Sequence, residues 1–490
     1  MHREPVAVAF SIVRNSVALM AVGLLAKGMG LVLAVLIARF LGPSAMGLFA
    51  LLFSIALLVE FVAPLGLQDV LIREVAARPR ERVRLWRQAA TLAVSASLIP
   101  SAAFLIAAYM YRDQESVHRC LVTLAIGMPF SALALVGQSA LQGMEKILYL
   151  AWTTFITRAA SLAVLVVMLM QGMGVESAFI SRVLFQAASA ALFTWIVLRN
   201  APPHEESGRP HIDFARTLPF AVNRMVTEST TRAPLLLLPI LFTLAQIGIF
   251  DAADRIRLTL GIMVSVATTS IMPSLARSFA NESGDRHSLV AYSSKYVCLA
   301  LSGAAVFISI FADVIIHLLY GARFAQSALL LQVLVWTQML LATDTVLKQA
   351  MIANGREYAV VVRALIGLAC LAALVLGLGH FFGLVGSAAG VLASAAITFS
   401  MDTGFVARHV IAFDVPRFLL KPLGCAFLTG AVLLLLDGAS PLLRLAAGVG
   451  TYLLAATLTG LVPKDERKFL ADAVRHGFAK RRQAEPPVLE

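Results

Sequence analysis

The sequence is poor in charge, in acidic residues and in cysteine. Of its 490 residues only 14% are charged, and its 40 Lys and Arg outnumber its 28 Asp and Glu. A soluble chain of this length needs a far more polar surface, so the low charge excludes an ordinary soluble protein. The four cysteines, Cys120, Cys298, Cys370 and Cys425, are scattered without the spacing of a metal or redox site, and we expect free thiols.

Hydrophobic residues, at 59% of the chain, take the place of the missing charge. Apolar runs of about 20 residues recur, each long enough to cross a bilayer as a helix. We therefore predict an all-α polytopic membrane protein with about 14 transmembrane helices. The predicted spans are 15–40, 44–67, 85–111, 117–141, 147–170, 174–198, 213–241, 245–275, 289–319, 327–353, 358–380, 383–409, 417–437 and 441–462.

The basic residues are distributed unevenly between the two sides of these spans. With the N-terminus in the cytoplasm, 27 of the 40 Lys and Arg fall on the cytoplasmic side, four in outer loops and nine within spans. This bias predicts that both termini are cytoplasmic. The positive charge is thus a topology signal, and we expect no nucleic acid partner.

Short strings repeat between the two halves of the chain. MGLFALLF (46–53) matches IGIFDAAD (247–254), with Gly47 and Gly248 offset by 201 residues. GMEK (143–146) and GREY (355–358) are offset by 212, as are Gly174 and Gly386. The common order predicts a duplicated six-helix unit, that is, two pseudo-symmetric six-helix lobes around a central cavity. The predicted domains are an N-terminal lobe 1–205, a C-terminal lobe 206–410, an additional helix pair 411–463 and a cytoplasmic basic tail 464–490.

Charged residues interrupt the apolar segment 212–242. Arg224, Glu228 and Arg232 follow one another at intervals of four residues and share one helix face. Each charge at mid-bilayer costs about 2.5–3.5 kcal/mol even on insertion scales, so this face should not meet lipid. Two interpretations stay open: an internal Arg–Glu–Arg ladder that joins helices, or the wall of a polar chamber in a transporter.

Other spans carry charges of both signs. Asp254 with Arg257, and Asp344 with Lys348, have the helical spacing of structural ion pairs. Arg39 and Arg182 lie near span ends, where they could snorkel to the interface. The partner of Lys27 could be Glu60 in the next span. Further charges predicted at membrane depth are Arg158, Asp251, Arg255 and Asp402.

The excess of cations over acids within the spans suits a phosphate-bearing or acidic ligand, because charge-assisted hydrogen bonds are strong away from water. The predicted substrate-binding residues are Arg224, Arg232, Lys27, Arg255, Lys348 and Arg158. The candidates for coupling to an ion are Glu228, Glu60 and Asp251, and for each the alternative is a static salt bridge.

Several strings resemble a known transporter family. They are ARFLGPSAMGLFALL (38–52), GLQDVLIREVA (66–76), LQGMEKI (141–147), IGIFDAADRI (247–256), LYGARFAQSALLLQVL (319–334) and FGLVGSAAGVLASA (382–395). These resemble the polysaccharide-transporter branch, the Wzx-type oligosaccharide flippases, of the multidrug/oligosaccharidyl-lipid/polysaccharide flippase superfamily. The resemblance implies two six-helix lobes in a V and a bacterial plasma (inner) membrane location. It does not decide which glycan is carried, because O-antigen flippases, capsule or exopolysaccharide flippases and lipid II flippases are all relatives.

The function implied by this resemblance is a flippase, not an enzyme. It would move a polyprenyl-diphosphate-linked oligosaccharide from the cytoplasmic to the outer leaflet for surface polysaccharide biosynthesis, by ion-coupled alternating access. We expect no cofactor or metal, and the nucleotide-binding pattern G-x-x-x-x-G-K-[ST] is absent. A polysaccharide polymerase is an expected partner. The alternatives are a multidrug and toxin extrusion-type small-molecule antiporter and, less favoured by the short outer loops, a membrane-embedded glycosyltransferase or polymerase.

Overall fold

The computed structural model describes residues 28–62, 67–201, 218–261, 286–410, 415–436, 438 and 440–461. All regular structure within these ranges is helical. Nine of the described helices are long and apolar enough to cross a membrane, and Gly28–Leu41 and Leu419–Leu435 are shorter apolar helices. The chain is therefore an all-helical, multi-span membrane protein. The predicted basic tail 464–490 and residue Lys27 lie outside the described residues.

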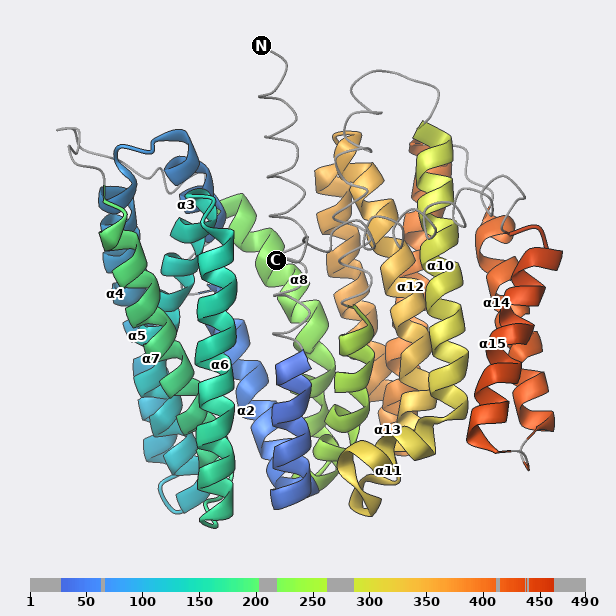
Figure 1. Ribbon diagram of the computed structural model, residues 1–490, viewed down its shortest axis with the longest axis horizontal. Helices are drawn as coiled ribbons and strands as arrows, with labels where there is room; N and C mark the ends of the chain where they lie inside the picture. The colour runs from blue at the N-terminus through green and yellow to red at the C-terminus, as the bar shows by residue number, and fades with distance from the viewer. Residues whose placement is uncertain are drawn as a thin grey trace, which may run out of the picture.

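The helices form two bundles and a separate pair (Figure 1). The N-terminal bundle contains the helix Gly28–Leu41 and six labelled helices: α2 (Pro43–Val62), α3 (Leu67–Ala77), α4 (Arg82–Met110), α5 (Glu115–Gly143), α6 (Ile147–Met170) and α7 (Glu176–Arg199). The C-terminal bundle contains α8 (Leu218–Leu237), η2 (Leu238–Ile240), a helix over 244–261, α10 (Arg286–Ile310), α11 (Ala312–Tyr320), η3 (Ala322–Phe324), α12 (Ser327–Ala353) and α13 (Glu357–His409).

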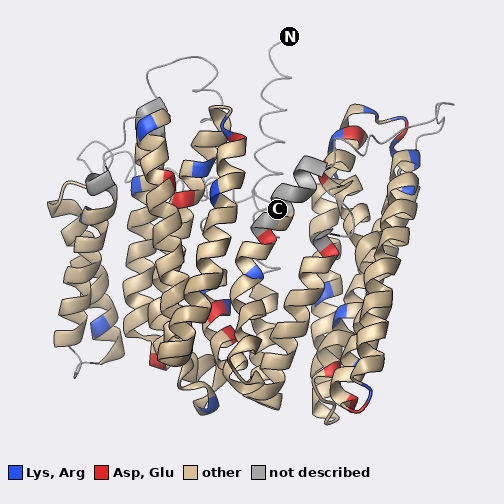
Figure 2. Cartoon of the chain, turned by 180° about the vertical axis from the view of Figure 1, so that it is seen from behind, with Lys and Arg blue, Asp and Glu red and all other residues tan. Residues whose placement is uncertain are grey.

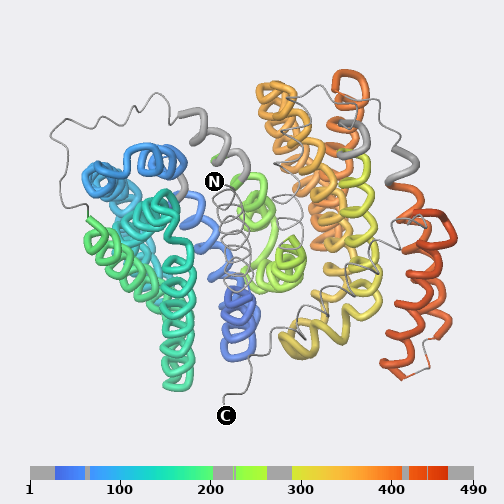
Figure 3. The backbone as a smooth tube through the Cα atoms, turned by 45° about the horizontal axis from the view of Figure 1, so that its top comes forward, coloured from blue at the N-terminus to red at the C-terminus, as the bar shows by residue number. Residues whose placement is uncertain are grey.

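The last two helices, α14 (Val415–Leu435) and α15 (Pro441–Leu458), pack on one another at the edge of the molecule (Figure 3). They reach the C-terminal bundle through α10, where the Tyr452 hydroxyl donates to the Leu299 carbonyl over 2.5 Å and lies 2.8 Å from the Ser302 hydroxyl. Ser440 caps α15 by accepting a hydrogen bond from the Leu443 amide, and Pro441 fits the first turn because its missing N–H has no helical partner.

One predicted span and one segment between spans differ from the observed helices. The predicted span 289–319 is interrupted at Phe311, where α10 ends and α11 begins as a separate short helix. The segment 67–77, which we did not predict as a helix, forms α3 and buries Leu67, Leu71 and Val75 against its bundle. Its hydrophobic positions recur at intervals of four, which the basic residues of this region obscured.

The 53-residue α13 is a helical hairpin rather than one rod. Gly383 has φ +64° and ψ −152°, a conformation open essentially to glycine alone, and it reverses the chain between two predicted spans. The Ser387 hydroxyl donates to the Val375 carbonyl over 3.0 Å across the hairpin. Gly386 and Gly390 let the two halves touch, because a Cβ on them would lie 2.0 and 2.6 Å from carbonyl oxygens of the facing half.

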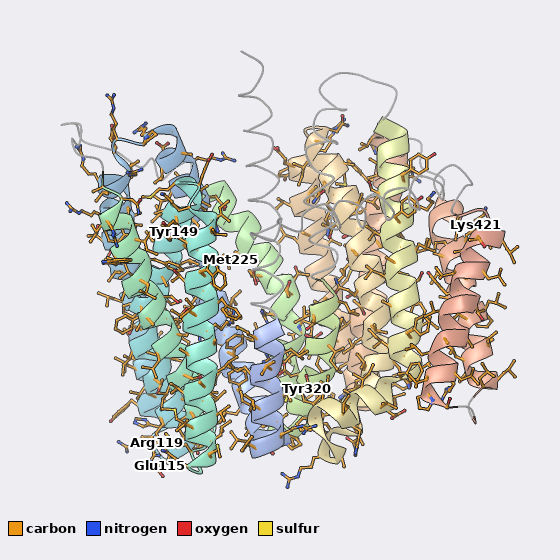
Figure 4. All side chains as sticks on the ribbon, in the orientation of Figure 1. Glu115, Arg119, Tyr149, Met225, Tyr320 and Lys421 are labelled. Atoms are coloured by element: carbon orange, nitrogen blue, oxygen red, sulfur yellow. The ribbon has the colours of Figure 1, made fainter. Side chains whose placement is uncertain are left out.

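Among the described residues, the two bundles share one hydrophobic core at only one end of the helices. We call this the α11 end; it contains α11 and the turn before Glu115, and Figure 4 places Glu115, Arg119 and Tyr320 there. The shared core joins Phe49 and Phe179 of the N-terminal bundle to Phe250 and Phe324 of the C-terminal bundle. At the opposite end, which contains α3, each bundle has its own core.

Candidate anion site between the bundles

Charged residues are sparse along the helices and lie mostly near their ends, as Figure 2 shows from behind. One group of exceptions lies where the bundles meet. Arg158 on α6, Arg182 on α7, Arg255 on the helix 244–261 and Arg232 on α8 form what we call the arginine row. Arg158 lies close enough to Arg182, and Arg232 to Arg255, for the like charges in each pair to repel one another.

Arg182 is held by a carboxylate from another helix. Its Nη2 lies 2.5 Å from Glu60 Oε1 on α2, and the Gln186 side-chain amide donates to the same oxygen over 2.8 Å. The guanidinium also lies 4.6 Å from the centre of the Phe53 ring. The expectation that Arg182 snorkels to the interface is therefore wrong, because its charge is paired inside the bundle. Glu60, expected to pair with Lys27, has Arg182 as its described partner.

Arg255 brings a C-terminal-bundle charge to the N-terminal bundle. Its Nε lies 2.6 Å from Asp251 Oδ2, one helical turn earlier. Its guanidinium lies 5.2 Å from the ring centre of Phe49 and 5.8 Å from that of Phe53, both on α2. A guanidinium that stacks on rings of the other bundle ties the two bundles together at this depth.

Arg158 is a half-buried cation of the row that lacks a described carboxylate partner. It stacks 5.2 Å from the ring centre of Phe185, and no described Asp or Glu lies within ion-pair distance of it. Arg158, Arg182 and Arg255 together line a cavity of about 60 Å³, with Ser161, Ser181 and three Phe rings completing the wall. Three guanidiniums around one small cavity can bind an oxygen-rich anion.

Arg232 extends the row along α8. Its Nε is buried without a hydrogen-bond partner, and it forms no ion pair within 4.0 Å among the described residues, although Glu228 lies one turn before it. The ion pair between Glu228 and Arg232 that the predicted Arg–Glu–Arg ladder requires is thus not formed. The side chain of Arg224 and all of Lys27 lie outside the described residues, so the structure does not place them.

The row carries an excess of positive charge. Its four guanidiniums face the carboxylates of Glu60, Asp251 and Glu228. A neighbouring acid, Asp254, belongs to the predicted pair with Arg257, which is confirmed at 2.6 Å between Asp254 Oδ1 and Arg257 Nε. Without a bound anion this excess is costly away from water, so the arrangement favours an anionic ligand.

Lys348, also predicted to bind substrate, lies elsewhere. Its Nζ is 2.6 Å from Asp344 Oδ2, which confirms that predicted pair, and 3.7 Å from Asp402 Oδ2. Arg363, which we had counted on the cytoplasmic side, lies within α13 with its Nε 2.5 Å from Asp402 Oδ1. No local sequence pattern predicts this contact, because its partners are 39 residues apart. The structure thus places Lys348 in a charged cluster inside the C-terminal bundle.

The described residues hold no group of three His, Cys, Asp or Glu side chains placed to bind a metal ion. The four cysteines are free, as the sequence predicted, and three of them are buried. What the site offers is therefore charge, hydrogen-bond donors and aromatic rings.

Solved structures of transporters share this fold. The chain resembles the lipid II flippase MurJ in an inward closed conformation, with a TM-score of 0.66 and 15% identity over 91% of this chain and 99% of that one. It also resembles an inward-facing multidrug resistance MATE family transporter of the MOP superfamily, with a TM-score of 0.66 and 13% identity. The match covers 80% of this chain and 98% of that one. A third similar structure is a MOP superfamily transporter from Pyrococcus furiosus, with a TM-score of 0.62 and 14% identity. The match covers 81% of this chain and 95% of that one.

These identities show the fold alone, which is that of the MOP superfamily. No curated protein matches the sequence. A family model described as "Polysaccharide biosynthesis protein" matches residues 12–279, more than half of the chain. The chain therefore belongs to the polysaccharide biosynthesis protein family, as a flippase-like membrane transporter with the MOP fold.

Proposed function

We propose that the protein moves a polyprenyl-diphosphate-linked oligosaccharide from the cytoplasmic to the outer leaflet, without covalent chemistry. The observation that carries this proposal is the unneutralised charge of the arginine row, in which the half-buried Arg158 lies beside two paired arginines. A diphosphate supplies the missing negative charge, and its oxygens suit the planar fork of a guanidinium. The family and the flippase-like fold agree with such a cargo.

The proposal includes the arrangement of the chain in the membrane. We propose fourteen spans in two six-helix lobes plus a pair, with domain boundaries at residues 205, 410 and 463 and both termini in the cytoplasm. The α3 end then faces the cytoplasm and the α11 end faces outward. Because the bundles share a core only at the α11 end, the observed conformation is closed to the outside. Rocking of the bundles about this end would change which leaflet reaches the arginine row.

The candidates for ion coupling also follow from contacts with the arginine row. Asp251 and Glu60 each bind an arginine of the row, and Glu228 lies one turn from Arg232. A carboxylate that releases its arginine to the diphosphate can take up a proton or another cation, so these three remain our candidates for coupling.

The MATE-type fold similarity supports a second candidate, a small-molecule antiporter. A pump for cationic drugs needs acidic cavity walls, whereas the row between the bundles is basic. If the second candidate were right, a deletion strain would become sensitive to drugs and keep its surface polymer.

The experiment is complementation of a deletion strain with Arg158→Gln or Arg232→Gln. We expect surface polysaccharide output to fall at least about tenfold, since a hydrogen bond to a charged group contributes about 1.5–3 kcal/mol. Completed lipid-linked units should accumulate facing the cytoplasm, while the amount of protein in the membrane stays unchanged. The matched control is Arg199→Gln, an exposed arginine at the end of α7 that stacks on Trp195. Full polymer output from both row variants would overturn the proposed site.

A further inference from the structure

A second cavity lies inside the C-terminal bundle, and the transport scheme above does not use it. Its volume is about 470 Å³, within the range of about 300–1,000 Å³ typical of small-molecule sites. Four helices line it: α8, the helix 244–261, α12 and α13. Much of the wall is apolar, with Leu258, Leu341, Leu371 and Val391 among its residues.

Several hydroxyl groups in the polar part of this wall present only hydrogen-bond acceptors to the cavity. The hydroxyls of Thr345, Ser394 and Thr398 donate to carbonyls of their own helices, over 2.8, 2.9 and 2.9 Å. Their hydrogens are thereby used, and their oxygen lone pairs remain to accept from a ligand. A ligand for this surface must therefore bring donors.

Two further polar groups in the wall have no partner. Thr337 Oγ1 and Gln349 Oε1 are buried and form no hydrogen bond. Both residues line the cavity, and Thr337 is only 1% exposed. Asp344 also lines it, but its carboxylate already interacts with Lys348 and with Asp402. Buried polar atoms are almost always satisfied, so two unsatisfied ones around one cavity indicate a polar occupant.

The charges in the wall do not favour a cation or an anion. Asp344 is paired with Lys348, and Arg257 is paired with Asp254 while its Nη1 lies 3.5 Å from Gln338 Oε1. The wall is thus close to neutral, and Lys348 and Arg257 would repel a cationic drug. A neutral ligand with many hydroxyl groups and apolar C–H faces matches both the acceptors and the leucine-rich wall.

The cavity lies next to the arginine row. Thr230 and Thr231 of α8 line the cavity, and the following residue, Arg232, belongs to the row. A ligand with its diphosphate on the row can therefore extend a group attached to that diphosphate toward the cavity. In a lipid-linked oligosaccharide the attached group is a sugar.

We propose that this cavity binds a neutral sugar residue of the transported lipid and so reads the glycan. This inference rests on the proposed function, because the position of the sugar follows from that of the diphosphate. The side-chain oxygens of Thr337 and Gln349 receive sugar hydroxyls. The described lining contains no aromatic side chain, so hydrogen bonds and shape hold the ring instead of stacking.

The test compares lipids by native mass spectrometry of the purified full chain. The probes are bare polyprenyl diphosphate and the same lipid carrying glucose, galactose, N-acetylglucosamine or N-acetylgalactosamine. We expect the wild type to retain at least one sugar-bearing lipid more strongly than the bare one. Thr337→Val should reduce that preference about three- to tenfold, the effect of one lost hydrogen bond, and Gln349→Leu should act similarly. Retention of the bare lipid should not change.

The matched control is Thr403→Val. Thr403 is also buried with an unpartnered hydroxyl on α13, but it does not line the cavity. Thr337→Val removes an unsatisfied group without changing volume, so the variant should fold as well as the wild type. Equal retention of bare and sugar-bearing lipids by the wild type, or equal effects of Thr337→Val and Thr403→Val, would overturn the sugar site alone. A wild type that retains none of these lipids would instead overturn the proposed function.

Discussion

At the scale of single residues, the buried charges of this protein fall into two kinds. Asp402 accepts from Arg363 and faces Lys348, and such pairs satisfy charge inside the membrane. Arg158 and Arg232 have no described carboxylate within ion-pair distance. Paired charges add little net stability but are costly to break, whereas an unpaired cation is retained for what it binds. The two kinds therefore respond differently to substitution.

For the paired kind we predict that Asp402→Asn destabilises the protein by about 3–5 kcal/mol, because Arg363 is left buried and uncompensated. The measurement is thermal unfolding of the purified chain in detergent. Adding Arg363→Met to the same chain should recover much of the loss, since neither charge then remains unpaired. The control, Asp113→Asn in the exposed turn before α5, should stay within about 0.5 kcal/mol of the wild type. A double variant less stable than Asp402→Asn would contradict this account.

The same residues show how far the sequence could predict the site. The pairs Asp344–Lys348 and Asp254–Arg257 could be inferred because helix geometry alone brings positions three or four apart together. The contacts Arg182–Glu60 and Arg363–Asp402 join helices, so packing decides them. For Arg182 one signal existed: Gln186 follows it at four residues and so shares its helix face.

At the scale of elements, α2 and the helix 244–261 cross at two glycines. A Cβ on Gly47 would lie 1.8 Å from the Leu244 carbonyl oxygen, and one on Gly248 would lie 2.0 Å from that of Pro43. The pairs Pro43 with Leu244 and Gly47 with Gly248 are each offset by 201 residues. The contact is thus reciprocal, as expected for two copies related by an axis. Packing of small residues is a main source of helix association in a bilayer.

We predict that Gly47→Ala separates these two helices by roughly 1.5–2 Å, because carbon and oxygen need about 3.5 Å. The displacement should weaken the shared core at the α11 end, lower the unfolding temperature and reduce transport, while insertion into the membrane continues. Thermal unfolding and polymer output measure the two effects. Gly404→Ala is the control, since a Cβ there meets nothing within 4 Å. Wild-type stability and transport in Gly47→Ala would contradict the role of the crossing.

Sequence patterns located most of these elements but not their interruptions. Apolar length places α2, α5, α6 and α12 within a few residues of their observed bounds, because a bilayer requires long apolar helices. The break at Phe311 could not be predicted, since the apolar pattern continues through it into α11. There the second half of the segment, α11, turns to meet the other bundle.

At the scale of the whole molecule, hydrogen bonds join the two bundles at the α11 end. Arg39 of the helix Gly28–Leu41 donates through Nε to the Leu319 carbonyl over 2.8 Å and through Nη2 to the Leu318 carbonyl. These carbonyls lie in the last turn of α11, where a cation is favoured by the helix dipole. Arg39, which we expected to snorkel, thus joins the bundles at the end where their core is shared.

We predict that Arg39→Gln shifts the protein toward opening at the α11 end. The glutamine loses the charge and the forked donor, so closure there is weakened while each bundle keeps its own core at the other end. Distances between spin labels measure this in a chain whose four cysteines are replaced by alanine. Labels at the exposed residues Tyr111 and Leu318 should move apart, and labels at Tyr149 and Tyr358 should approach.

The opposite sign of the two distance changes is the essential part of this prediction. Local loosening of α11 would lengthen only the first distance, whereas rocking of rigid bundles about their shared core must change both. Arg112→Gln is the matched control, because this exposed arginine at the same end contacts Tyr109 of its own bundle. A change confined to the α11 end, or an equal change in Arg112→Gln, would mean that Arg39 does not govern the proposed rocking of the two bundles.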